Sequence, residues 1–84
     1  MSTRVLFFAS LREAVGEAEL ALDLDGPVSL DGLLKRLQGR LSPAGYAALT
    51  AENVRVAINQ ELQNGPLEVQ PGDEVAFLPP VTGG

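Results

Sequence analysis

One apolar stripe constrains the fold of this chain more than any other feature. Its leucines recur at the spacing that places them on one face of a helix; they are Leu30, Leu33, Leu34, Leu37 and Leu41. Ser29 can cap the first turn of this helix. Lys35, Arg36 and Arg40 lie off the stripe, toward the end of a helix that favours positive charge. Because an amphipathic helix must bury its stripe, we expect residues 30–41 to cover one face of a sheet.

The sheet itself is expected from short runs of β-forming residues. Strands are predicted at residues 4–9, 18–24, 54–58, 61–62 and 74–78. The run at 18–24 alternates cleanly, with Leu20, Leu22 and Leu24 directed inward. This alternation is typical of a strand with one side in water, and we expect it to run antiparallel to the first strand.

Two short helices are predicted beside the long one. Ser10 can cap a helical turn that Gly16 ends. Ser42, followed by Pro43 at the first helical position, starts a helix through Leu49. Helices placed between an N-terminal hairpin and later strands predict an α+β domain of the ubiquitin-like β-grasp class, with a mixed sheet and the helices packed on one face.

The composition excludes several classes of function. The 84 residues include no cysteine and no histidine, so disulfides, zinc fingers, iron–sulfur clusters and Cys/His catalysis are ruled out, and we expect no bound metal. A net charge of −5 argues against nucleic acid and suits a partner with a basic surface. No apolar run reaches the length of a membrane span, and Met1 is not followed by a secretory leader. We expect a soluble, cytoplasmic protein that is complete from Met1.

The first predicted strand is apolar on both of its faces. If the helix covers the face that carries Val5, Phe7 and Ala9, the opposite face presents an apolar patch close to the last strand. Its members are Leu6, Phe8, Leu62 and Leu78. Such patches on small proteins mark interaction sites, which is the interpretation we favour. The alternative is that residues 43–49 or 60–70 cover the patch.

The chain ends in a stretch that is poor in side chains. We assign residues 1–78 to the domain and residues 79–84 to an extended tail, made of Pro79, Pro80, Val81, Thr82, Gly83 and Gly84. Fully extended, this tail reaches roughly 20 Å, and its glycines can pass through a narrow channel in another protein. Its only reactive group is the α-carboxylate of Gly84, which is what an adenylating enzyme needs. The alternative is an ordinary frayed terminus.

The whole chain resembles the small subunits of molybdopterin synthase, a family of ubiquitin-like sulfur carriers. The resemblance is carried by residues 5–9, 11–16, 56–60 and 72–84. The last of these segments, GDEVAFLPPVTGG, is the most specific, because ubiquitin has a different run before its diglycine. Leu78 departs from the pattern, since close relatives often have a second phenylalanine there.

The resemblance implies a function for the tail. A ubiquitin-activating-type adenylyltransferase would adenylate Gly84 with ATP and Mg²⁺, and sulfur would then replace AMP to give a thiocarboxylate. The tail would donate this sulfur to cyclic pyranopterin monophosphate inside the large synthase subunit, in a heterotetramer of two large and two small subunits. The large subunit would supply the catalytic residues. This chain would then be no enzyme on its own, and it would bind no cofactor itself.

Some alternatives remain open at the level of the sequence. Arg12, assigned to the same partner interface, can hold the tail, pair with an acidic residue of a partner, or simply solubilise the surface. The carrier could instead serve thiamine biosynthesis or tRNA thiolation. It could also be a protein modifier conjugated to lysines, or an interaction domain with an inert tail.

Overall fold

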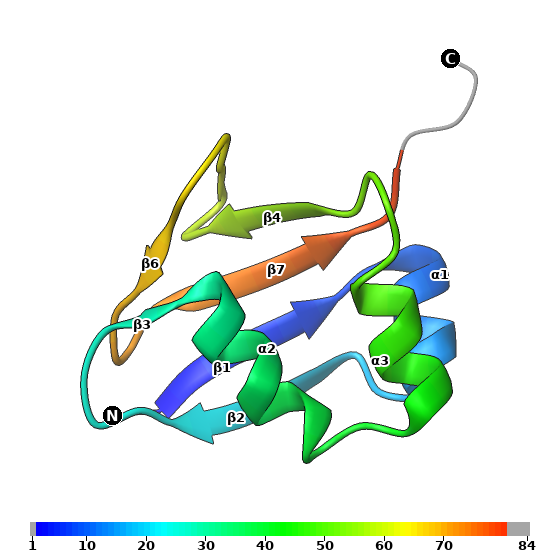
Figure 1. The fold of residues 1–84 in the computed structure, drawn as a ribbon, viewed down its shortest axis with the longest axis horizontal. Helices are drawn as coiled ribbons and strands as arrows, with labels where there is room; N and C mark the ends of the chain where they lie inside the picture. Colours follow the sequence, from blue (N-terminus) through cyan, green and yellow to red (C-terminus); the bar gives the residue numbers. More distant parts are fainter. Residues whose placement is uncertain (1, 81–84) are drawn as a thin grey trace.

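A mixed sheet of five strands organises the protein, and the computed structural model describes it over residues 2–80 (Figure 1). The strand order is β2-β1-β7-β4-β5. The bounds are Ser2–Phe7 for β1, Glu19–Asp23 for β2, Arg55–Ile58 for β4, Glu61–Leu62 for β5 and Glu74–Leu78 for β7. β1 is antiparallel to β2 and parallel to β7, and β7 is antiparallel to β4. The expected α+β, ubiquitin-like arrangement is confirmed.

The helices cover one face of this sheet. They are α1, Ala9–Val15; α2, Leu30–Gln38; and α3, Pro43–Leu49. Leu33 and Leu37 of α2 are fully buried, as the leucine stripe predicts. The Ser29 Oγ accepts a hydrogen bond from the Gly32 N–H at 3.1 Å and caps the helix, and Ser42 caps α3 in the same way.

The core lies between the helices and the sheet. Alternate residues of the strands enter it, among them Val5, Phe7, Leu20, Leu22, Val56, Val75 and Phe77. Leu11 of α1 and Leu49 of α3 join them from the helical layer. Because successive side chains on a strand point to opposite faces, this inward set fixes which residues the other face of the sheet presents.

The junction between β1 and α1 differs from the prediction. The strand was expected over residues 4–9, but it ends at Phe7, and Ala9 is the first residue of the helix with a φ of 51°. Ser10 does not cap this helix; Phe8 occupies the N-cap position and makes no side-chain capping bond. The Phe8 carbonyl accepts from the Leu11 N–H at 3.0 Å, so the chain turns into the helix directly after the strand.

A second, two-stranded sheet was not predicted. It pairs β3, Val28–Ser29, with β6, Glu68–Val69. Each strand has only two residues, which is too short for an alternating pattern to register. Within residues 2–80, no helix has the length and apolar character needed to cross a membrane.

Candidate functional site

A row of apolar residues crosses the sheet on the face opposite the helices. Leu6 pairs with Ala76, Ala76 pairs with Ala57, and Ala57 pairs with Leu62. These residues alternate with the core residues of the same strands, and so they point away from the core. Phe8 follows β1, on the same side of the chain as Leu6 and two residues further on.

These residues line an open groove of about 450 Å³. Its lining consists of Leu6, Phe8, Ala57, Gln60, Leu62, Glu74, Ala76 and Leu78. The alanines on the central strands β4 and β7 are short, and larger side chains flank them on either side. Phe8 is 45% exposed and Leu62 is 55% exposed, so each presents much of its apolar surface to solvent. A groove of this kind offers binding energy to an apolar segment of a partner.

The apolar patch expected from the sequence is therefore confirmed as a surface. Leu6, Phe8, Leu62 and Leu78 all line the groove. Neither segment that could have covered the patch does so: α3 packs against α1, and Leu62 of the 60–70 segment is itself exposed at the groove. That this surface binds a partner remains a prediction.

The other predicted site residues are placed as follows. Arg12 lies on α1 with its residue exposed, and it does not line the groove. The chain leaves β7 at Leu78; Pro79 is partly buried and Pro80 is exposed. Val81, Thr82, Gly83 and Gly84 lie outside the described residues.

Four lining residues were missed by the sequence reasoning. Ala57 and Ala76 could have been found, because each alternates with inward-facing residues of its strand. Glu74 and Gln60 carry no such signal, because a charged or amide side chain at the end of a strand or in a turn is ordinarily a solvated surface residue. Their place at the groove depends on the register between β1, β7 and β4.

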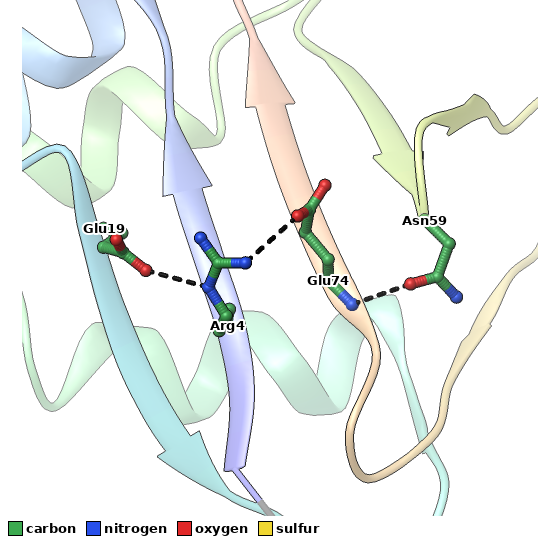
Figure 2. Close-up of polar contacts among 4 residues, drawn as sticks. All are labelled: Arg4, Glu19, Asn59 and Glu74. Carbon is green, nitrogen blue, oxygen red and sulfur yellow. Dashed lines mark hydrogen bonds and ion pairs between the residues drawn. The ribbon is translucent and has the colours of Figure 1, made fainter.

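A network of hydrogen bonds and ion pairs joins Arg4, Glu19, Glu74 and Asn59 (Figure 2). Glu74 also lines the groove, so the network lies at its edge. The Arg4 Nε donates to Glu19 Oε2 at 3.1 Å, and its Nη1 donates to Glu74 Oε1 at 3.4 Å. The hydrogen bond with Glu19 and the charge of that carboxylate raise the pKa of Arg4 above its ordinary value, and Glu74 adds to this shift. The Glu74 N–H donates to Asn59 Oδ1 at 3.0 Å, which joins β7 to the turn after β4.

The groove is a mainly apolar surface. Its lining is apolar apart from Glu74 and Gln60. In the part of the chain that the structure describes, no three acidic side chains lie close enough together to hold a metal ion. What this geometry can do is dock a partner beside the point where the chain leaves the sheet.

Comparison with known proteins places this chain in a family. The sequence profile of the ThiS family matches residues 5–84. This chain belongs to the ThiS family. A relative from Haemophilus influenzae, named molybdopterin synthase sulfur carrier subunit, is 41% identical over 95% of this chain and 96% of its own length. A relative with the same name from Escherichia coli is 38% identical over 96% of this chain and 98% of its own.

Solved structures agree on the fold of this ThiS family member. SAMP1 from Haloferax volcanii superposes with a TM-score of 0.75 at 26% identity, and the match covers 100% of both chains. A second match is found in a complex of subunits 1 and 2 of the molybdopterin-converting factor from Helicobacter pylori. It has a TM-score of 0.65 at 24% identity and covers 100% of both chains.

Proposed function

We propose that this chain is the sulfur carrier subunit of molybdopterin synthase, acting in the biosynthesis of the molybdenum cofactor. The observation that carries the proposal is the near full-length similarity to two proteins of that name. The groove supports it, because a carrier must be recognised by the proteins that load and unload it. Leu78, the last residue of β7, lines the groove, so a docked partner lies next to the start of the tail.

The tail supplies the chemistry in this proposal. A ubiquitin-activating-type adenylyltransferase uses ATP and Mg²⁺ to adenylate the Gly84 carboxylate. Sulfur then attacks the acyl adenylate and displaces AMP, because AMP is a far better leaving group than the oxide ion that a free carboxylate would have to expel. The resulting thiocarboxylate donates its sulfur to cyclic pyranopterin monophosphate, and two such transfers complete the dithiolene of molybdopterin.

The large synthase subunit is the partner that we propose for the groove. One structure with the same fold was solved in a complex of the two subunits of a molybdopterin-converting factor. The large subunit supplies the catalytic residues and encloses the tail, which protects the reactive thiocarboxylate from water. In this assignment the present chain acts in a sulfurtransferase complex of two large and two small subunits, in the cytoplasm.

Reconstitution tests the proposal. The chain is prepared with a C-terminal thiocarboxylate and mixed with the large subunit and cyclic pyranopterin monophosphate, and molybdopterin is measured by its fluorescent oxidation product. We expect product from the thiocarboxylate form and none from the unmodified carboxylate form. A variant that lacks Gly83 and Gly84 is the control, and it should fold normally because the core is built from residues 5–77. No product from a fully thiocarboxylated protein would refute the assignment.

A further inference from the structure

The groove has two chemically different ends. Where the chain leaves the sheet, the lining is apolar and includes Phe8 and Leu78. At the opposite end it is polar and consists of Glu74 and Gln60. Glu74 and Leu78 are the first and last residues of β7, so the two ends are roughly 13 Å apart. A docked partner therefore meets an asymmetric surface.

We propose that the polar end receives a basic side chain, arginine or lysine, from the large synthase subunit. This contact fixes the direction in which the partner lies on the groove and so directs its active site toward the tail. The inference rests on the proposed function, and it adds the residues of this chain that determine specificity. Three observations on the described residues carry it.

The first observation is the incomplete pairing of the Glu74 carboxylate. Arg4 reaches it at 3.4 Å but holds Glu19 more closely, at 3.1 Å. The Glu74 side chain is 24% exposed, against 51% for Glu19, so Glu74 has lost more of its water. Among residues 2–80, no side chain other than Arg4 donates to this carboxylate. A partly desolvated carboxylate with one long hydrogen bond gains from a second, charged donor.

The second observation is the charge of the network. Arg4 supplies one positive charge, while Glu19 and Glu74 supply two negative ones. The network therefore keeps an excess negative charge, in a chain whose net charge is −5. Complementary charge favours a cation at this position and disfavours an acidic side chain.

The third observation is the conformation of Gln60. Asn59 and Gln60 form the two-residue turn between β4 and β5, and their φ angles are 50° and 71°. Turns of this kind favour glycine at the second position, because any other residue is strained there. Gln60 keeps a side chain at that strained position, and this residue lines the same groove as Glu74. Its amide oxygen can accept a second hydrogen bond from the same basic group.

Two matched substitutions test the contact. Glu74→Gln and Glu19→Gln each remove one negative charge and one carboxylate partner of Arg4, but only Glu74 lines the groove. Binding of each variant to the purified large subunit is measured by calorimetry at about 50 mM and about 500 mM NaCl. We expect Glu74→Gln to weaken binding about tenfold at low salt, with a smaller loss at high salt. Glu19→Gln should weaken binding clearly less than Glu74→Gln, because Glu19 adds charge to the network but does not line the groove.

Gln60→Gly should change stability and affinity in opposite directions. Glycine relieves the strain in the turn, so the thermal midpoint should rise, while the loss of the side chain should weaken binding severalfold. A structural role alone would not separate stability from affinity in this way.

Equal affinities of Glu74→Gln and Glu19→Gln would overturn the inference and leave the proposed function standing. A wild-type chain that does not bind the large subunit at all would overturn both. These two results are distinguishable in the same set of titrations.

Discussion

Phe7 and Phe77 stack in the core with 6.1 Å between their ring centroids and 19° between the ring planes. They are in register on the parallel neighbours β1 and β7. The residue that follows each, Phe8 or Leu78, lines the groove instead. One pair of strands thus supplies the core with one set of alternate residues and the docking surface with the other. Neighbouring positions should therefore respond differently to substitution.

Phe8→Asp is expected to weaken binding of the large subunit by roughly tenfold or more, because it places a charge in the apolar part of the groove. Stability should be retained, since Phe8 is 45% exposed and aspartate is favoured at its N-cap position. Calorimetry and thermal unfolding measure the two effects. Phe7→Ala is the matched contrast, expected to lower the free energy of unfolding by about 3–5 kcal/mol. If Phe8→Asp bound the large subunit as tightly as the wild type, the groove would not be part of the interface.

Gly45 and Gly32 should respond in opposite directions to alanine. A Cβ at Gly45 would lie 3.3 Å from the Ala14 carbonyl oxygen and the Val15 Cα, both in the backbone of α1. Backbone in a packed helix cannot easily move aside, so we expect Gly45→Ala to lower stability by about 1–3 kcal/mol. A Cβ at Gly32 meets nothing closer than 3.5 Å, so Gly32→Ala should raise stability by up to about 1 kcal/mol. Urea unfolding measures both, and a stabilised Gly45→Ala would contradict close packing of α1 on α3.

Ala9 stores strain at the start of α1. Its φ of 51° lies in the left-handed region, which is unfavourable for any residue with a Cβ. Ala9→Gly should therefore raise the free energy of unfolding by about 1 kcal/mol, and Ala9→Val should lower it by at least as much. Thermal unfolding of the two variants measures both changes in stability. If Ala9→Val were as stable as Ala9→Gly, Ala9 would not have the left-handed conformation that joins β1 directly to α1.

Much of the fold could be predicted because local signals agree with it. The bounds of α3 and β7 match the prediction, since Ser42-Pro43 marks the helix start and the Pro71-Gly72-Asp73 turn precedes the strand. The start of α1 was misplaced because Ala9 has no sequence signal for a left-handed conformation. β3 and β6 were missed because strands of only two residues form through tertiary contact and leave no alternating pattern in the sequence.

The apolar half of the candidate site could be predicted, and the polar half could not. Leu6 and Phe8 stand out because a strand that is apolar on both faces needs a second covering surface. Glu74 is part of the site only because the parallel register sets it beside Arg4. Register between strands distant in sequence is a property of the folded chain, and so no local pattern reports it.

The central claim is that Gly84 carries sulfur, and the intact mass of the protein tests it most directly. The chain is incubated with the adenylyltransferase, ATP, Mg²⁺ and a sulfide source, and the Escherichia coli relative serves as a positive control. The account predicts a mass increase that corresponds to one oxygen replaced by sulfur, assigned to Gly84 by fragmentation and absent from a variant without Gly84. An unchanged mass, under conditions that convert the control, would contradict the account.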